Sequence, residues 1–291
     1  KGEWTTFENM IFPENYDVII TGGTKVNLEN KALFWVRGSI QSIGTKYKSI
    51  HFTSKDNTGS FFVSNGNKTS NLNFVQFHGL SDSDVDGAQL SGAVNFYESD
   101  VNINNVKIEN NTSEDALNIV RSHFNIDSIQ FKNTQSDAFD ADYSTGFIKN
   151  AEFNNIGNDA LDFSGSEIEM VDIKITSAGD KGISGGENSI ITGERITISK
   201  TEIGLVSKDL SELSLNEVSL NNVKLPIAVF QKKKEFGAAK MTLSNYEVKK
   251  YREMYFVEEG SSIRINDKII TPNKIDVSSL LYGSFYGKST R

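Results

Sequence analysis

AFDADYSTGFI, residues 138–148, follows the pattern of ALNIVRSHFNI at 116–126 and is followed in turn by ALDFSGSEIEM at 160–170. Each of these blocks starts 22 residues after the one before it. Blocks with a similar start continue the series at 182 and 204, and the next block outward on either side starts 23 residues away, at 93 and 227. A fixed interval of this length indicates a repeat architecture, in which each unit stacks on its neighbours.

Short strands are the expected content of each unit. Apolar residues recur two positions apart in every block, which is the spacing of β-strands, and no segment longer than a turn has helical spacing. The equivalent apolar residues form two columns: Val106, Ile129, Ala151, Ile173, Ile196 and Val218 in one, and Ile108, Phe131, Phe153, Ile175, Ile198 and Leu220 in the other. Three short strands per turn predict an all-β chain folded as a right-handed parallel β-helix. Leucine-rich repeats have a similar period, but their LxxLxLxxN signature is missing.

One domain should hold the whole chain of 291 residues. We expect an N-terminal cap at residues 1–30, coils at 31–266 that are clearest at 93–249, and a C-terminal cap or tail at 267–291. A solenoid needs such caps because an open β-edge invites association. The acidic insertion SDSDVDG at 81–87 should bulge out of the coils.

Charge and composition argue against several classes of partner and site. The net charge of −8 argues against nucleic acid or an anionic membrane surface as a partner. The chain has no cysteine, which excludes disulfides and thiolate metal sites. No apolar run reaches transmembrane length, so membrane insertion is not expected. The chain starts at Lys1 without a methionine or a signal-like segment, so we expect a mature protein or an excised fragment.

The repeated blocks crowd carboxylates on one surface. Phe139 and Ala141 point inward by alternation, so Asp140 and Asp142 point outward along one strand. With the neighbouring blocks they make two acidic columns, Asp115–Asp137–Asp159 and Asp140–Asp162. Neighbours in a column lie roughly 4.8 Å apart, where like charges repel by about 3 kcal/mol at an effective dielectric of 20. A divalent cation, a carboxyl kept protonated or nearby basic residues would relieve that repulsion.

Basic side chains continue the same surface. Lys181 extends the first acidic column, and Lys208 lies in the column of Asp142. The basic run FQKKKEFG follows the strand beyond Lys208 and would form a lip for an anionic sugar chain. The residues that we expect to bind substrate share this outward strip: Arg121, Asp142, Glu187, Asp209 and Lys232.

Turn chemistry is an alternative explanation for part of this pattern. Aspartate is favoured at turns because its side chain bonds nearby backbone, so the first column is equally consistent with a structural or cation-stabilised ladder. Asp140, Asp142 and Asp162 lie in mid-strand, where aspartate is disfavoured, and this favours a functional role for them. Taken singly, Lys181 and Lys208 are more often charge neutralisers than catalysts.

Over roughly residues 90 to 230 the blocks resemble the pectin-processing, pectin-lyase-like right-handed β-helix enzymes. In polygalacturonases, successive turns carry NTDG-, DD-, GHG- and RIK-type motifs, and here the corresponding places hold SDAF at 136–139, NDAL at 158–161, DKGISGG at 180–186 and LVSK at 205–208. This resemblance implies that Asp137 and Asp159 are the acid and base of glycoside hydrolysis and that Lys208 holds a substrate carboxylate. The chain departs from the family where Asn158 replaces an aspartate, Lys181–Gly182 replaces the histidine motif and Val206 replaces the arginine.

Calcium-dependent polyuronate lyases and epimerases offer a second resemblance. Such β-helices hold Ca²⁺ with acidic residues and use lysine and arginine as base and acid. The resemblance implies a Ca²⁺ site of Asp137, Asp140, Asp159 and Asp162, with Lys181 and Lys208 as the bases. It tolerates the missing histidine, so elimination or epimerisation of an acidic, uronate-type polysaccharide is slightly favoured over hydrolysis.

A looser likeness is to β-helix segments of bacterial envelope proteins associated with CotH-type domains. It implies a non-catalytic carbohydrate-binding or structural domain of a larger chain, since a fold alone assigns no activity. These resemblances share an expected location, which is secreted or at the bacterial cell surface.

Overall fold

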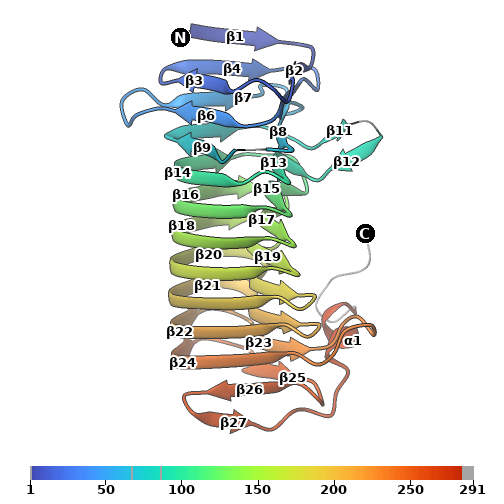
Figure 1. Cartoon of the computed structure of the whole chain (residues 1–291). Coiled ribbons are helices and arrows are strands. Elements are labelled where there is room, and N and C mark those ends of the chain that lie inside the picture. Colours follow the sequence, from blue (N-terminus) through green and yellow to red (C-terminus); the bar gives the residue numbers. More distant parts are fainter. Residues whose placement is uncertain (1, 67, 86, 284–291) are drawn as a thin grey trace.

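Parallel coils, one above the other, make up the body of the molecule. The structure is a computed structural model that describes residues 2–66, 68–85 and 87–283. It is a β-solenoid of about 12 turns with roughly 22 residues per turn and 65% strand (Figure 1). The all-β parallel β-helix predicted from the repeat is thereby confirmed.

Three parallel sheets run along the solenoid, one for each strand of a coil. The first, called the site sheet below, contains β2 (Met10–Phe12), β5 (Leu33–Arg37), β8 (Ser60–Ser64), β13 (Gly92–Tyr97), β15 (Asp115–Val120), β17 (Asp137–Asp142), β19 (Leu161–Ser164), β23 (Leu225–Phe230), β25 (Tyr255–Val257) and the C-terminal parts of β20 (Glu167–Gly186) and β21 (Ile190–Lys208). The second sheet begins with β3 (Val18–Thr21), β6 (Ile40–Ile43) and β9 (Ser70–Asn73), and the third with β1 (Gly2–Thr6), β4 (Thr24–Leu28), β7 (Ile50–Thr53) and β10 (Val75–His78).

Further along the chain, a single long strand in each coil bends and serves both the second and the third sheet. These strands are β14 (Val101–Glu109), β16 (His123–Thr134), β18 (Thr145–Ile156), β20, β21, β22 (Glu212–Asn221) and β24 (Lys240–Lys249). β26 (Ser262–Ile265) continues the second sheet, and β27 (Lys268–Ile270) folds back on it in antiparallel fashion.

Single residues in the left-handed conformation make the corners between the sheets. β14 bends at Asn105 and β18 at Asn150, with φ of 52° and 55°. Asparagine tolerates this conformation because its short side chain bonds locally. At another corner Asn110, Asn133 and Asn155 stack, and their side-chain amides are joined from coil to coil at 2.9 and 2.8 Å. The asparagines therefore fix where each coil turns.

Aromatic side chains fill the interior. Phe131 and Phe153, on adjacent coils, stack with ring centroids 5.0 Å apart, and Phe139 meets Phe163 edge to face at 5.8 Å. All four rings are buried, and each such burial contributes about 1.5–3 kcal/mol. Because Phe139 and Phe163 point inward, the residues next to them on β17 and β19 must point outward by alternation.

A ladder of buried serines follows the site sheet and was not foreseen from the sequence. After the first serine, the hydroxyl of each one accepts a hydrogen bond from the backbone N–H of the serine one coil earlier, at 2.8–3.2 Å. The members of the ladder are Ser99, Ser122, Ser144, Ser166, Ser189 and Ser211. The ladder ties successive coils together at the corner beside the site.

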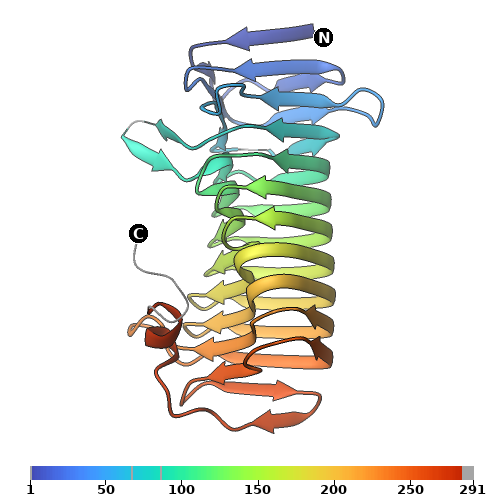
Figure 2. The ribbon, with the colours of Figure 1, turned by 180° about the vertical axis from the view of Figure 1, so that it is seen from behind.

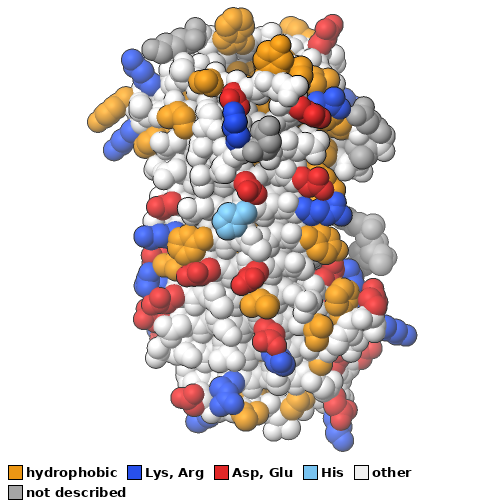
Figure 3. Space-filling model, viewed as in Figure 1, with side chains coloured by type: hydrophobic (Ala, Val, Ile, Leu, Met, Phe, Trp, Pro, Cys, Tyr) orange, Lys and Arg blue, Asp and Glu red, His pale blue; other side chains and the backbone are white. Residues whose placement is uncertain are grey.

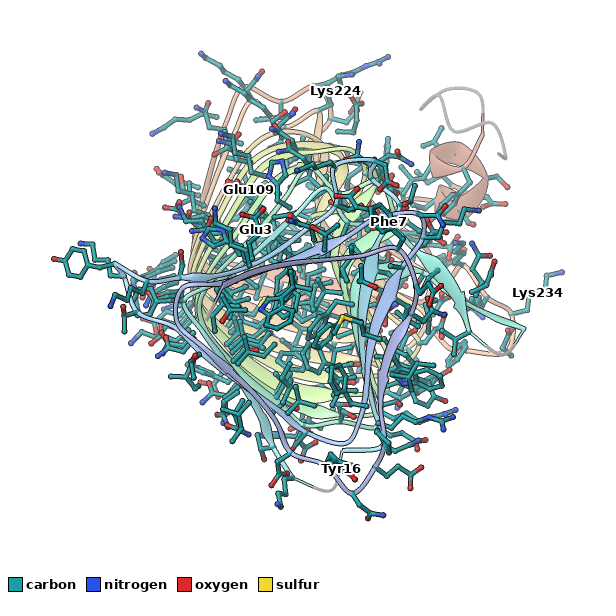
Figure 4. The ribbon with its side chains drawn as sticks, turned by 90° about the horizontal axis from the view of Figure 1, so that it is seen from above. Glu3, Phe7, Tyr16, Glu109, Lys224 and Lys234 are labelled. Atoms are coloured by element: carbon teal, nitrogen blue, oxygen red, sulfur yellow. The ribbon has the colours of Figure 1, made fainter. Side chains whose placement is uncertain are left out.

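The two ends of the solenoid differ. Residues 2–30, predicted to be a cap, hold β1 to β3 as a first coil and β4 in the next one, and β1 pairs with β4. Trp4 lies in register with inward-pointing Val26, yet 61% of it is exposed. Figure 3 shows hydrophobic side chains gathered at this end, and Figure 4 looks down on it. At the other end β27 and the helix α1 (Val277–Leu281) cover the last coils.

Two projections leave the same side of the solenoid (Figures 1 and 2). The acidic insertion predicted at 81–87 belongs, in its described part, to the antiparallel hairpin of β11 (Ser83–Val85) and β12 (Ala88–Leu90). The second projection is α1, which lies within the predicted C-terminal cap. No helix in the described part of the chain is long and apolar enough to span a membrane.

Candidate functional site

The outward face of the site sheet brings the predicted aspartates together. Asp140 on β17 pairs in register with Asp162 on β19, and Asp115 on β15 pairs with Asp137 on β17. Phe139 and Ala141, between them, are fully buried. The spacing of 22 residues therefore places these carboxyls side by side on adjacent strands.

Asp137 and Asp159 are joined to the next coil through its backbone. The N–H of Asp159 donates to Oδ1 of Asp137 at 2.8 Å, and the N–H of Lys181 donates to Oδ1 of Asp159 at 3.0 Å. The side-chain amide of Asn158 also donates to Asp137, at 2.6 Å. This is the hydrogen-bonded turn ladder considered as an alternative for the first column. The ladder holds these carboxyls in fixed positions.

Lys181 is buried between two carboxylates. Its ammonium group lies 2.8 and 3.2 Å from the oxygens of Asp159 and also contacts Asp180. Burial works to lower the pKa of Lys181, but the charge of Asp159 and its hydrogen bond, together with the charge of Asp162 and other neighbours, raise it. Only 6% of the side chain is exposed. Lys181 is thus a fixed cation within the sheet, whereas the sequence predicted a base facing the substrate.

Lys208 reaches back across two coils. Its ammonium group donates to Oγ of Ser184 at 2.9 Å and lies 3.4 Å from Oδ1 of Asp162. Gly186 leaves room for this path, because a Cβ there would stand 2.7 Å from the lysine Cε. Burial would lower the pKa of Lys208, but the charge of Asp162 raises it. The predicted ligand for a substrate carboxylate is therefore occupied by Asp162.

Burial raises the pKa values of the carboxyls that have no close lysine. Burial, followed by the charge of Asp159, raises the pKa of Asp137 to about 8. Burial and then the charges of Asp115 and Asp162 raise the pKa of Asp140 well above its ordinary value. Burial likewise raises the pKa of Asp115 to about 6. At neutral pH the site thus contains protonated carboxyls beside carboxylates that face ammonium groups.

Four of the five predicted substrate-binding residues lie around the acidic face, and the fifth, Asp209, does not. Arg121 is exposed and binds the Tyr97 hydroxyl, and exposed Lys232 places its ammonium 4.3 Å from the ring centroid of Tyr282. Glu187 accepts a hydrogen bond from Lys233. Asp142 lies on β17, and burial followed by the charge of Asp162 raises its pKa. These residues surround the acidic face.

Asp209 differs from the prediction. It is fully buried, and its Oδ1 accepts hydrogen bonds from the backbone N–H groups of Lys232 and Lys233 at 2.6 and 2.7 Å. Its role is to anchor the loop that carries those lysines, so it offers no surface to a sugar.

Sequence reasoning missed Asp180, Ser184 and Tyr282. Asp180 stands next to Lys181 in DKG, and this adjacency in the sequence could have indicated their ion pair. Ser184 could be placed in the column of Asp140 and Asp162, but its bond to Lys208 depends on a side-chain path that no spacing reveals. Tyr282 arrives from the last described helix and has no place in the repeat.

The four aspartates predicted to bind Ca²⁺ are only partly available. Asp159 binds Lys181 and Asp162 binds Lys208, so ammonium groups stand where a cation would. Within residues 2–66, 68–85 and 87–283, no three histidine, aspartate or glutamate side chains are grouped to hold a metal ion. Calcium binding stays a prediction.

A long groove of about 1200 Å³ lies on a different face, along the corner between the second and third sheets. Its lining combines apolar surface with polar and charged side chains, which include Gln76, Lys107, Gln130, Glu152, Lys174 and Arg195. Arg195 is held there in a surface ion pair with Asp172, at 2.6 Å. The acidic face is the stronger candidate for chemistry, because its carboxyls are buried or half-buried and the pKa values of Asp115, Asp137, Asp140 and Asp142 are raised.

Solved structures support the fold assignment. The search for a matching family model and the search of curated proteins gave no match. The catalytic domain of a GH87 α-1,3-glucanase in complex with tetrasaccharides matches with a TM-score of 0.50 and 12% identity, over 86% of this chain and 63% of that one. Tailspike protein 2 from Escherichia coli O157:H7 bacteriophage CAB120 matches with a TM-score of 0.45 and 15% identity, over 86% and 38%. An exopolygalacturonase from Thermotoga maritima matches with a TM-score of 0.43 and 11% identity, over 90% and 85%.

These neighbours are right-handed parallel β-helix proteins, as the sequence resemblance implied. The chain spans less than two thirds of the glucanase domain's length. At 12% identity the likeness to the glucanase domain concerns the fold alone, and the function has to be argued from the acidic face.

Proposed function

We propose that this β-helix is a glycoside hydrolase that cleaves a polysaccharide on the outward face of the site sheet. Asp140 is the general acid and Asp162 is the carboxylate partner. Glycosidases of this kind need one carboxyl that carries a proton for the leaving oxygen and one that is ionised. A pair of neighbouring acids in opposite environments meets that requirement.

The single observation that carries the proposal is the contrast between these two neighbours. Asp140 and Asp162 are cross-strand partners. Burial keeps the pKa of Asp140 high, and Asp140 has no hydrogen-bond partner among the described residues. Asp162 forms an ion pair with Lys208 at 3.4 Å. A glycosidic oxygen placed over Asp140 would receive its proton while Asp162 activates water or stabilises the developing positive charge on the sugar.

The state of the lysines favours hydrolysis over elimination. A lysine that abstracts a proton must be neutral, which needs a lowered pKa. Burial works to lower the pKa values of Lys181 and Lys208, but the surrounding groups, led by Asp159 and Asp162 respectively, together raise them. Both ammonium groups are also bound to carboxylates, so neither is free to hold a uronate. We therefore favour an uncharged sugar at the cleavage point, and an acidic chain would have to place its carboxylates near Arg121 and Lys232.

The resemblance to a glucanase catalytic domain solved with bound tetrasaccharides supports a polysaccharide substrate by analogy of fold. It leaves the sugar and its linkage open. A secreted or cell-surface location would suit such a substrate and remains part of the proposal.

The test is the release of reducing ends from a panel that includes α-1,3-glucan and polygalacturonate. Wild type should release them from at least one polymer, whereas Asp140→Asn and Asp162→Asn should lose at least 100-fold in rate, as expected when a general acid or base is removed. Glu169→Gln, on an exposed position of another face, should behave as wild type. Circular dichroism would confirm that each variant is folded.

Other outcomes would select the alternatives. Unsaturated products that absorb in the ultraviolet, and that disappear with a chelator, would establish calcium-dependent elimination. An unchanged rate in Asp140→Asn would overturn the assignment of the acid. Binding to a polymer without either product would favour the non-catalytic carbohydrate-binding domain.

A further inference from the structure

The outward column that holds Asp140 and Asp162 is covered at its C-terminal side. Beyond Asp162 the column continues through Ser184 to Val206 and Ala228. Val206 and Ala228 are fully buried, in a cluster with Val277 and Leu281 of α1. The helix therefore lies on the same surface as the acid pair and closes it two coils away from Asp162.

Tyr282 completes this wall. It follows α1 and packs against the same apolar cluster, with its ring centroid 6.4 Å from that of Phe230. The Lys232 ammonium covers its ring at 4.3 Å. Its phenol also lies close enough to Lys181 and Lys208 to influence them electrostatically. Tyr282 thus stands at the border between the wall and the acidic face.

The same column is covered on its N-terminal side as well. From Asp140 it runs back through Asn118 and Asn95 to Phe62 and Trp35. Trp35 and Phe62 stack at 5.6 Å, and Val85 of β11 and Leu90 of β12 pack against them. The hairpin and α1 rise from the same side of the solenoid in both views (Figures 1 and 2).

The interval between the two walls is short and only partly exposed: Asn95, Asn118 and Ser184 are buried, whereas Asp140 and Asp162 are partly exposed. Adjacent coils are about 4.8 Å apart, so Val206 lies about 10 Å beyond Asp162 and Phe62 about 14 Å before Asp140. A polymer that passed straight through would collide with both walls.

Building on the proposed hydrolysis, we infer that the site accepts the end of a glycan chain, and that Tyr282 and α1 form the wall that limits the product to short sugars. Tyr282 is a specificity-determining residue in this scheme. Asp140 and Asp162 cleave the bond, and the wall decides which bond along the chain reaches them.

The product-length distribution tests this inference. On the hydrolysed polymer, wild type should release short oligosaccharides from the start, and solution viscosity should fall slowly relative to the rise in reducing ends. Tyr282→Ala should increase the share of longer products severalfold while reducing ends still form. Tyr282→Phe keeps the ring and should give the wild-type distribution. Tyr251→Ala, an exposed tyrosine away from the site sheet, is the control.

An early fall in viscosity with wild type, unchanged in Tyr282→Ala, would overturn the inference, because it would mean that the groove is open. A binding measurement separates this failure from a failure of the proposed hydrolysis. The Asp140→Asn protein should bind α-1,3-glucan or polygalacturonate oligomers more tightly than the parent polymer at equal mass, in proportion to the number of chain ends. Equal binding at equal mass would contradict chain-end recognition, even if wild type released no reducing ends.

Discussion

At the scale of single residues, aspartates at equivalent places in successive coils differ in protonation because only some of them meet a lysine. Asp137 and Asp140 face mainly other acids, and burial raises the pKa of both. Asp159 and Asp162, one coil further on, bind the ammonium groups of Lys181 and Lys208. Two of the three ways to relieve repulsion between crowded carboxylates, protonation and a nearby basic residue, thus operate side by side. The contrast between them is what gives the site acid–base potential.

The dependence of stability on pH should report the buried protons directly. Asp137 has a folded pKa of about 8 against an ordinary value of 3.8. The folded state therefore keeps a proton that the unfolded chain has lost, so its contribution to stability is complete below pH 3.8 and disappears as the pH rises through 8. The free energy of unfolding should fall between pH 5 and pH 9, and Asp137→Asn should reduce that fall. Urea denaturation at the two pH values measures it.

Glu169→Gln provides the comparison for this measurement, because its side chain is exposed on another face and should leave the wild-type pH dependence intact. An equal loss of stability from pH 5 to pH 9 in Asp137→Asn and wild type would mean that Asp137 is ionised at neutral pH in the folded protein.

Sequence spacing was sufficient to place the aspartates but not to assign their partners. A 22-residue step puts Asp140 beside Asp162 whatever their side chains do. The ion pairs depend on where long, flexible lysine side chains go, and Lys208 crosses two coils to reach Asp162. Asp209 was predicted to lie on the same strip, but a tight turn of left-handed residues buries it.

At the scale of elements, corners and ladders hold each coil to the next. The repeat of apolar residues predicted the strands, because alternation is a property of the local sequence. The serine ladder was harder to foresee, since serine is common at turns and its stacking becomes visible only in register. The placement of α1 over Val206 and Ala228 could not be predicted either, because it joins segments about 50 to 70 residues apart with no shared pattern.

One serine in the middle of the ladder offers a test of its contribution. Ser144 is buried, accepts from the N–H of Ser122 at 3.2 Å and donates to the carbonyl of Asp142 at 2.9 Å. In Ser144→Ala the N–H of Ser122 loses its acceptor, which should lower the free energy of unfolding by about 1–3 kcal/mol. Chemical denaturation checks this. Ser214→Ala, at an exposed position on β22, should change stability by no more than about 0.5 kcal/mol. If the ladder does not contribute to stability, Ser144→Ala and Ser214→Ala should have the same free energy of unfolding.

At the scale of the whole molecule, the solenoid is asymmetric. The C-terminal coils are covered by β27 and α1, whereas the first coil leaves the outer edge of β1 without a strand partner among the described residues. Trp4 is 61% exposed and Phe7 63%. An uncovered edge with apolar side chains favours pairing with another molecule. The caps expected at both ends are therefore not equivalent.

Self-association through this end should be sensitive to charge. We expect wild type to associate as its concentration rises, and Trp4→Lys to weaken that association, because a charge on an edge strand opposes strand pairing. Sedimentation velocity over a range of concentrations is the measurement. Tyr47→Lys adds the same charge at a loop residue that is 91% exposed and should leave association as in wild type. A wild-type chain that stays monomeric throughout would contradict the expectation.

The distance between the walls at either end of the acidic face depends on the number of coils between them. Each coil inserted between the hairpin and α1 would lengthen the interval by about 4.8 Å without altering a single catalytic side chain. Duplication of one 22-residue unit would then change how much of a sugar chain fits, in whole steps, while leaving the chemistry where it is. In such a protein the number of coils between the walls sets the length of sugar chain that fits, and related solenoids with more or fewer coils there should accept chains of different lengths.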